Sequence, residues 1–403
     1  MSIGEVRPAP GARHDGRVGR SQRLGVAVVG TGFVGPHHVD AVRRGGYGEV
    51  VALVGSDASR TASRAASLGV PASTTDLDEV LRDPAVDVVH VCTPNHTHVE
   101  LGMRVLDAGK HLVMEKPVAL DSASAARLAE RADERGLHAA VAMTYRGYPM
   151  VSRAREMVAA GSIGQIRLIH GAYLQDWLAD ETDYNWRLEP ESGGASRAVA
   201  DIGTHWLDTA EYISGQRVVA VLAELATFIP TRMRPAAGAT AFSSGDGPAE
   251  SVTVRSEDAA VILLRFEDGA RGATVISQVS PGRKNAFTLE IAGSRQSLGW
   301  EQELPERLWI RAREESRLQV RDQADARANG AGVPPLPAGH PEGWSEALRD
   351  LLRPFYAAIA SGEPVPGPAD APYPTLHTGV RGLCFVEAVL ASAGSGEWTN
   401  LAG

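Results

Sequence analysis

The chain has 403 residues, of which 43% are hydrophobic and 22% are charged, and its formal net charge is -9. This length exceeds one typical core, so we expect two domains. The acidic balance argues against non-specific binding to nucleic acid or to anionic membranes, and no stretch holds the roughly 20 apolar residues of a membrane span. The two cysteines, Cys92 and Cys384, lie far apart along the chain, which favours a reduced, cytoplasmic protein.

The first part of the chain alternates between short apolar strands and helices. Residues 1–23 precede it, and because they lack both apolar periodicity and the apolar stretch of a signal peptide, we expect a disordered tail there. Alternation with short connections predicts a doubly wound parallel sheet, so residues 24–145 are expected to form a Rossmann domain of the α/β class. The expected strands are 24–29, 50–54, 86–92, 111–114 and 138–144.

The remainder, residues 146–403, has a different pattern. Strands follow one another closely, with turn residues between them, which predicts an α+β domain with an open, mostly antiparallel sheet. An exposed apolar sheet face has to be covered, so we expect a homodimer or homotetramer formed through this sheet. The expected strands are 165–173, 218–228, 259–266, 271–279, 286–291 and 308–311, with loops at 231–250 and 313–345 and a last helix at 376–393.

The first strand runs into a glycine-rich string, G-T-G-F-V-G, at residues 30–35. In a strand–turn–helix context this is the dinucleotide fingerprint. Gly30 permits the tight turn, Gly32 lets the backbone approach a pyrophosphate, and Gly35 allows close packing of helix on sheet. The residues of this turn expected to touch the cofactor are Gly30, Thr31, Gly32, Phe33 and Val34.

The second strand lacks the acidic residue that commonly holds the adenosine ribose, because Gly55 stands in its place. Two alternatives remain open. Ser56 and Arg60 can receive a ribose phosphate, which favours NADP, whereas Asp57 can reach back to the ribose diol, which favours NAD.

Three further strings point to chemistry. C-T-P-N-H-T-H at 92–98 and E-K-P at 115–117 each follow a strand, and D-I-G-T-H-W-L-D at 201–208 lies in the second domain. Ligands bind at the carboxyl ends of strands in open α/β sheets, so the first two strings lie at the expected crevice. Together the strings resemble the Gfo/Idh/MocA oxidoreductase family, from about residue 24 to the end of the chain.

The resemblance implies a Rossmann domain followed by a domain with an open, mostly antiparallel sheet. It also implies an NAD or NADP cofactor, a sugar, inositol or related polyol as substrate, and dimers or tetramers. Lys116 matches the family's catalytic lysine, and Asp201 and His205 match its catalytic pair. The residues implied near the nicotinamide and its ribose are Thr93, Pro94, Asn95, His98, Glu115 and Lys116. The departure from the family pattern is Gly55, which leaves the choice of cofactor open.

These residue types suit hydride transfer from a carbinol carbon, which requires removal of the hydroxyl proton. His205 can take that proton because an unperturbed histidine has a pKa of about 6.5. Lys116 then keeps positive charge beside the developing alkoxide, or alternatively carries the proton itself. Asp201, four residues before His205, either orients the imidazole or contacts the substrate.

Aromatic and polar side chains near these strings predict a hydroxyl-rich ligand. The expected substrate residues are Tyr145, Arg146, Trp177, Tyr184, Trp186, Arg187, Asp201 and His205. No metal is expected, since the spacing of His96, His98 and His111 fits no zinc pattern.

The sequence therefore predicts an NAD(P)-dependent dehydrogenase or reductase that acts on a sugar or polyol. The alternative is a redox-neutral enzyme. Such an enzyme would hold NAD tightly and oxidise one carbon transiently, which enables glycoside cleavage, elimination or epimerisation.

Overall fold

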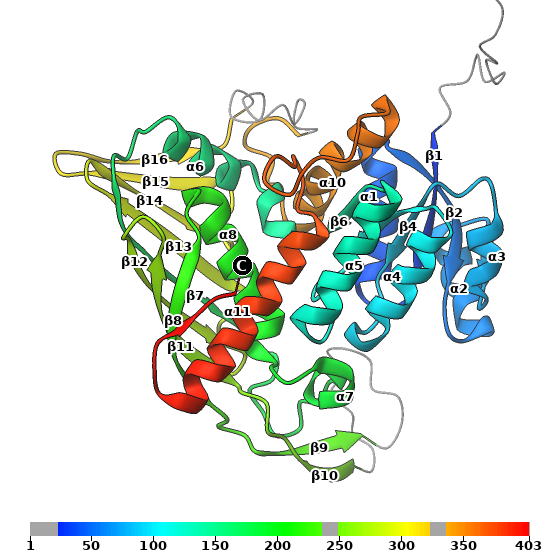
Figure 1. The fold of residues 1–403 in the computed structure, drawn as a ribbon, viewed down its shortest axis with the longest axis horizontal. Helices are drawn as coiled ribbons and strands as arrows, with labels where there is room; N and C mark the ends of the chain where they lie inside the picture. Colours follow the sequence, from blue (N-terminus) through cyan, green and yellow to red (C-terminus); the bar gives the residue numbers. More distant parts are fainter. Residues whose placement is uncertain (1–22, 236–248, 323–335, 403) are drawn as a thin grey trace, which may run out of the picture.

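The computed structural model describes residues 23–235, 249–322 and 336–402 (Figure 1). The expected disordered tail lies outside the described residues apart from Arg23. Two sheets form the two halves of the molecule, one parallel and one mixed, and helices lie between them. Within the described ranges, no helix combines the length and the apolar character needed to cross a bilayer.

The first sheet is fully parallel and has the strand order β3-β2-β1-β4-β5-β6. Its central strands are apolar on both faces, and every residue of β4 is buried, as expected for a sheet covered by helices on both sides. The order reverses between β1 and β4, and that switch point is where a dinucleotide binds in such sheets. The strands are β1 (Leu24–Val29), β2 (Gly48–Val54), β3 (Ala72–Thr74), β4 (Val88–Val91), β5 (His111–Met114) and β6 (Ala139–Val141).

Local sequence sets the ends of the covering helices. Asp57, Asp76 and Asp121 each accept a hydrogen bond from a backbone amide of the first turn that they precede. The helices are α1 (Val34–Gly45), α2 (Ala58–Leu68), α3 (Leu77–Arg82), α4 (His98–Asp107) and α5 (Ser122–Arg135).

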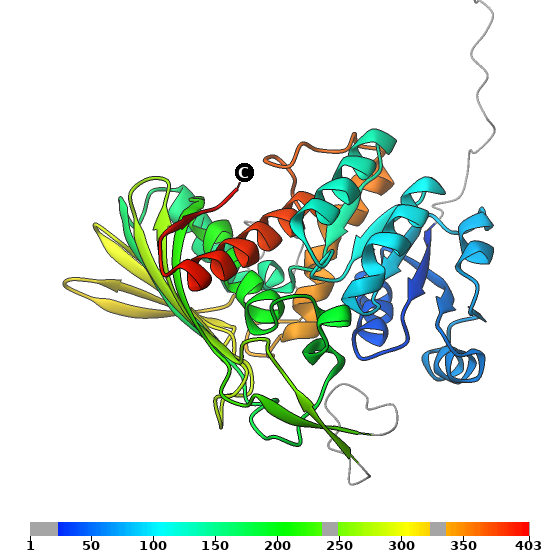
Figure 2. The ribbon, with the colours of Figure 1, turned by 60° about the horizontal axis from the view of Figure 1, so that its bottom comes forward.

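The second sheet is mixed and mostly antiparallel, with β7 and β12 as its parallel pair. The predicted fold class is therefore confirmed for both halves. Figure 2 shows the helices α6 (Pro149–Ala159), α8 (Thr204–Ser214) and α11 (Leu376–Ser395) on one face of this sheet. The strands are β7 (Ile166–Leu174), β8 (Val218–Ala226), β11 (Ala259–Phe266), β12 (Arg271–Ser277), β13 (Ala286–Gly293), β14 (Gln296–Glu301), β15 (Arg307–Ala312), β16 (Ser316–Val320) and β17 (Thr399–Asn400).

Both predicted loops contain strands, so those two predictions are wrong in part. In the first loop, β9 (Thr231–Pro235) pairs with β10 (Ala249–Thr253) in an antiparallel hairpin, while 236–248 lies outside the described residues. In the second, β16 extends the large sheet at its edge. β10 and β16 are largely exposed and β9 buries only Arg232, so these short strands lack the buried apolar face on which strand prediction rests.

The helix α10 (Trp344–Ser361) begins where the second predicted loop ends, in a stretch for which no element was predicted, and returns to the nucleotide-binding half. Leu348, Leu352 and Phe355 are fully buried in the cluster that contains the β1 and β2 side chains. Tyr47, which lies between α1 and β2, donates a hydrogen bond of 2.8 Å to the Arg349 carbonyl oxygen. The first sheet is thus covered by a helix from the far end of the chain.

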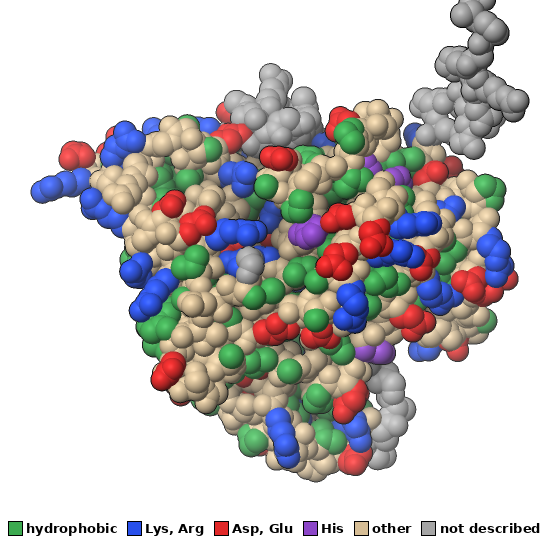
Figure 3. Space-filling model, in the orientation of Figure 1, with side chains coloured by type: hydrophobic (Ala, Val, Ile, Leu, Met, Phe, Trp, Pro, Cys, Tyr) green, Lys and Arg blue, Asp and Glu red, His purple; other side chains and the backbone are tan. Residues whose placement is uncertain are grey.

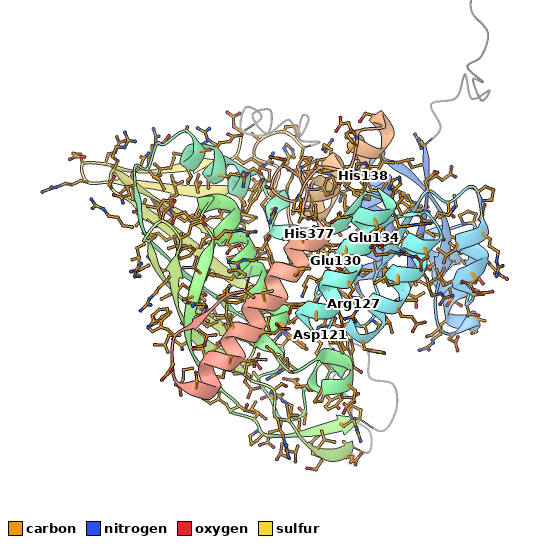
Figure 4. All side chains as sticks on the ribbon, in the orientation of Figure 1. Asp121, Arg127, Glu130, Glu134, His138 and His377 are labelled. Carbon is orange, nitrogen blue, oxygen red and sulfur yellow. The ribbon has the colours of Figure 1, made fainter. Side chains whose placement is uncertain are left out.

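The last helix, α11, also connects the two halves, because it packs against a helix of the first half. Figure 4 shows α11 beside α5, with Asp121, Arg127, Glu130 and Glu134 along α5 and His377 on α11. His377 Nε2 lies 2.8 Å from a carboxylate oxygen of Asp133, at the carboxyl end of α5.

Candidate active site

The glycine turn after β1 is shaped for close backbone approach. Gly30 has a φ of 114°, and a Cβ there would lie 2.5 Å from the Cys92 carbonyl oxygen. A Cβ on Gly35 would overlap the Gly30 carbonyl oxygen, whereas one on Gly32 would meet nothing within 4 Å. The open space at Gly32, next to the first turn of α1, fits a dinucleotide pyrophosphate. Thr31 and Val34 complete this turn, and the Phe33 side chain is exposed.

The end of β2 explains why glycine replaces the usual acid. A Cβ on Gly55 would overlap Thr61 Oγ1 and lie 2.9 Å from Thr31 Cγ2. Asp57 Oδ1 accepts a hydrogen bond of 2.8 Å from the Arg60 amide, so that oxygen caps α2. The Arg60 side chain is 78% exposed, and Ser56 is exposed as well. The side chains on which the choice between NAD and NADP depends therefore lie at the protein surface.

The loop after β4 is fastened to the loop after β5 by His98, which is completely buried. Its Nδ1 lies 2.7 Å from the Pro117 carbonyl oxygen, and its Nε2 lies 2.8 Å from the Thr93 carbonyl oxygen. Burial lowers the pKa of His98 although both carbonyls favour the charged ring. Pro94 and Asn95 lie within the loop that His98 holds. His98 thus supports the expected nicotinamide site from inside the protein.

The residues of the two halves meet at an ion pair. Lys116 Nζ lies 2.7 Å from Asp201 Oδ1 and 2.7 Å from the Asp201 carbonyl oxygen. The two side chains are only 12% and 13% exposed. Burial would raise the pKa of Asp201, but the positive charges of Lys116 and Arg187 hold it below its usual range. Asp201 is therefore a carboxylate, and Lys116 has two acceptors for its ammonium group.

Asp201 lies in an irregular turn whose partners come from distant parts of the chain. Residues Val199–Gly203 form a π-helical turn that leads into α8, a feature often found at functional sites. Asp201 Oδ2 accepts a hydrogen bond of 2.8 Å from Gln278 Nε2, and Arg187 Nε lies 3.3 Å from Oδ1. Gln278 was not among the predicted residues. A polar side chain just after β12 was the available signal.

His205 follows in the first turn of α8 and is buried. Its ring meets the edge of the Tyr145 ring at a centroid distance of 4.9 Å. Burial, and then the charge of Lys116, lowers the pKa of His205 to about 3. Among the described residues, Nδ1 has no hydrogen-bond partner, and the Asp201 carboxylate bonds to Lys116 and Gln278. Asp201 therefore does not fix the imidazole tautomer in this structure.

Glu115 is held by a buried chain of polar groups. Its Oε1 lies 2.9 Å from His38 Nε2, His38 Nδ1 lies 2.9 Å from His90 Nδ1, and His90 Nε2 lies 2.6 Å from the Tyr356 hydroxyl. Burial would raise the pKa of Glu115, but the hydrogen bond from His38 brings it below its usual value. With both rings neutral, only one assignment satisfies all three bonds. Tyr356 donates to His90, His90 to His38, and His38 to the carboxylate.

Several predicted substrate residues form a polar wall beside His205. The Tyr145 and Tyr173 hydroxyls are hydrogen-bonded to each other, and both bond to Asn285, at 3.2 and 2.7 Å. Gln175 Nε2 donates to Asn285 Oδ1 at 2.9 Å, and Gln175 Oε1 accepts from Trp177 Nε1 at 2.8 Å. Gln175 lies in the stretch expected to form the substrate wall, whereas Asn285 was not predicted, although it directly precedes a predicted strand.

The remaining predicted residues divide into two groups. Arg187 stacks on the Trp186 ring at 4.4 Å and reaches Asp201, so this pair joins the site. Arg146 instead forms a two-pronged ion pair with Asp208 and lies over the Tyr212 ring. Tyr184 is buried, and its hydroxyl donates to Glu189. The structure does not bring Arg146 or Tyr184 to Lys116 and His205. No group of three or more His, Cys, Asp or Glu in the described ranges is arranged to hold a metal.

Comparison with known proteins places this arrangement in a family. Residues 24–143 match the model of the oxidoreductase family with an NAD-binding Rossmann fold, and residues 151–299 match the Gfo/Idh/MocA C-terminal domain. Levoglucosan dehydrogenase of Pseudarthrobacter phenanthrenivorans is 30% identical over 410 residues, which cover 94% of this chain and 98% of that protein. The chain belongs to the Gfo/Idh/MocA oxidoreductase family.

Solved structures of the family superpose along nearly the whole chain. A levoglucosan dehydrogenase complex with NADH and levoglucosan has a TM-score of 0.84 and 28% identity, and the match covers 95% of this chain and 100% of that one. An inositol dehydrogenase homologue from Azotobacter vinelandii, with NAD+, has a TM-score of 0.79 and 27% identity over 94% of this chain and 98% of the other. The predictions of the family, of an oxidoreductase and of a nicotinamide dinucleotide are confirmed.

Proposed function

We propose that this Gfo/Idh/MocA protein is an NAD-dependent dehydrogenase that oxidises a secondary hydroxyl of a cyclic sugar of the levoglucosan type. The observation that carries the proposal is the contact of Lys116 with Asp201, because it joins the strand end of one half to the turn that precedes His205 in the other. The name of the relative that matches 94% of the chain supports the substrate class.

The side chains divide the chemistry between them. Bound NAD+ supplies the hydride acceptor. Burial and the charge of Lys116 lower the pKa of His205 to about 3, so its ring is neutral and we assign it the hydroxyl proton, although that low pKa makes it a weak base. Lys116 donates to two oxygens of Asp201, and its positive charge stabilises the alkoxide oxygen electrostatically.

The wall beside His205 suits an uncharged ligand rich in hydroxyls. Tyr145, Asn285 and Gln175 offer donors and acceptors of neutral type, and Trp177 adds an apolar ring. Such mixed surfaces satisfy hydroxyls and pack against the carbon face of a sugar ring.

Incubation of the purified protein with NAD+ and levoglucosan, followed by NADH absorbance, tests the proposal. Glucose, myo-inositol and a linear polyol serve as comparisons. We expect NADH to form fastest with levoglucosan or another cyclic sugar. Failure of all cyclic sugars to yield NADH overturns the proposal. Turnover of a glycoside without net NADH, by protein that retains NAD through dialysis, identifies the redox-neutral alternative instead.

We propose further that the protein assembles as a homodimer or homotetramer through the second sheet. Val261 and Leu263 alternate with buried residues on β11, and Val261 pairs with Val275 on β12, so exposed apolar side chains share the face that the helices leave open. The face seen in Figure 3, by contrast, mixes charges of both signs. The other exposed apolar residues of this sheet are Leu168, Val219, Trp309, Leu318 and Val320.

Light scattering on the purified protein tests this assembly, and Leu263→Asp should shift the mass toward the monomer. A monomeric wild-type protein contradicts it.

Cys92 and Cys384 are free thiols, which supports the proposed cytoplasmic location.

A further inference from the structure

The loop from Gln175 to Glu189 carries Trp186 and Arg187, yet little apolar packing holds it. Leu178, Tyr184 and Leu188 form a small cluster with Val254, separate from the larger cores, and the partly buried Trp177, Val252 and Val279 pack against it. A cluster of this size supplies limited hydrophobic stabilisation. Polar contacts therefore have to help fix the position at which Arg187 reaches Asp201.

Arg232, on β9, supplies that constraint. Its side chain is fully buried, and its guanidinium donates to the carbonyl oxygens of Leu178 at 2.9 Å, Asp180 at 2.9 Å and Asp183 at 3.2 Å. It also donates to Asp258 Oδ1 at 3.0 Å. A planar guanidinium can reach four acceptors in fixed directions, whereas a lysine ammonium cannot reproduce this fork.

Asp258 connects the same guanidinium to the segment that bears Asp201. It also accepts from Arg197, four residues before Asp201, and both side chains are fully buried. The neighbouring Glu257 accepts from the backbone amides of Arg197 at 3.0 Å and Val199 at 2.9 Å. The contacts that hold the loop of Arg187 and those that hold the turn of Asp201 therefore meet at the adjacent carboxylates of Glu257 and Asp258.

This buried ionic cluster is poorly suited to stability alone. Removing charges from water carries a desolvation cost that ion pairing often only offsets. Among the described residues, Arg197 Nε and Nη1 and Arg232 Nε are buried without a hydrogen-bond partner. Unpaired buried donors add to that cost.

We propose that Arg232, paired with Asp258, is a positioning residue that holds Arg187 against Asp201 and so sets how tightly the sugar binds. The inference rests on the proposed function for its kinetic part only. Arg232 touches no catalytic side chain, and its effect reaches the substrate through the Gln175–Glu189 loop.

Arg232→Lys is the test variant, because it keeps the charge and removes the fork. We expect KM for the sugar to rise about 10- to 100-fold, which corresponds to the loss of one or two charged hydrogen bonds, while kcat and the dissociation constant of NADH stay within about threefold. Asp258→Asn should shift KM in the same direction. An unchanged KM in a folded Arg232→Lys protein overturns the proposal.

Two arginines provide controls. Arg131 lies on α5 in the other half, is partly exposed and pairs with Asp107, so Arg131→Ala should leave KM unchanged. Arg321 is equally buried and bonds to Glu306 and to the carbonyl oxygens of Leu336 and His340, which lie outside the site. Arg321→Lys should lower the melting temperature without raising KM. An equal rise of KM in Arg321→Lys assigns the effect to general destabilisation and overturns the proposal.

Hydrogen exchange separates this proposal from the enzymatic one. Arg232→Lys should accelerate amide exchange across the Gln175–Glu189 loop and leave the first sheet unchanged, whether or not any sugar is oxidised. Should Arg232→Lys fail to fold, Asp258→Asn is measured in the same way. Unchanged exchange in the loop refutes the positioning role even if the dehydrogenase activity is found.

Discussion

The two halves of the molecule hold the side chains of the proposed active site by different means. Lys116 lies two residues after β5, whose last three residues are fully buried in a parallel sheet, so the topology of the sheet places it. Asp201 and His205 come instead from a π-helical turn and the helix after it, and that turn is fixed by buried ionic contacts from other segments. The first half positions a residue through backbone geometry, and the second through particular side-chain pairs. Substitutions should therefore be tolerated differently on the two sides of the site.

The largest expected effect is that of Lys116→Ala. Loss of the ammonium should lower turnover by about 10²–10⁴, as is typical of groups that act on proton transfer, because the alkoxide loses its positive neighbour. Steady-state kinetics and a fluorescence titration with NADH measure this, and cofactor affinity should change only a few fold. Lys110→Ala is the matched control, since Lys110 bonds to the carbonyl oxygens of Asp83 and Val86 at the other end of β5. Equal turnover of both variants removes Lys116 from the mechanism.

A second experiment asks how strongly the halves are coupled. Asp201→Asn leaves the Lys116 ammonium largely buried without its counter-charge, so the free energy of unfolding should fall by about 3 kcal/mol. In the double variant Lys116→Met, Asp201→Asn, part of this loss should be recovered, because the buried ammonium is gone and only Arg187, whose side chain is 24% exposed, still lacks its carboxylate. Urea denaturation of the single and double variants gives the coupling. Strictly additive losses would show that the pair contributes nothing across the interface.

The pH dependence of kcat/KM probes the environment of His205. Its pKa is lowered to about 3, first by burial and then by Lys116, so the proton-accepting neutral form is present from neutral pH down to acidic pH and is lost only as the pH falls through that value. We therefore expect no acidic limb near pH 6.5, where an unperturbed histidine would place one. In Lys116→Ala the residual activity should show its acidic limb at higher pH. A wild-type limb near the unperturbed value contradicts this assignment.

The smallest effect is expected at the edge of the nucleotide-binding half. Arg60 is 78% exposed and its nearest carboxylate oxygen, on Asp57, is 3.7 Å away, so Arg60→Ala should leave NADH affinity within about twofold, as is usual for an exposed charge. Titration of NADPH against the same variant separates the two cofactor alternatives. A loss of NADPH affinity alone would place a ribose phosphate beside Arg60.

The sequence was most informative about buried strands and about site residues that lie within short local motifs. The buried strands β1, β4 and β5 are continuous apolar runs, and Lys116, Asp201 and His205 were found through short strings whose spacing is local. Gln278, Asn285 and Arg232 could not be found in this way. Their importance comes from partners tens of residues away, and only the register of the second sheet brings them together.

The return of α10 to the first sheet bears on attempts to exchange parts between relatives. Leu348, Leu352 and Phe355 fill the same cluster as the β1 and β2 side chains, and Tyr356 ends the polar chain that reaches Glu115. A chimaera with a single junction near residue 145 would combine a nucleotide-binding sheet with a foreign covering helix. A working exchange has to carry 344–361 along with 24–145, as two separate inserts.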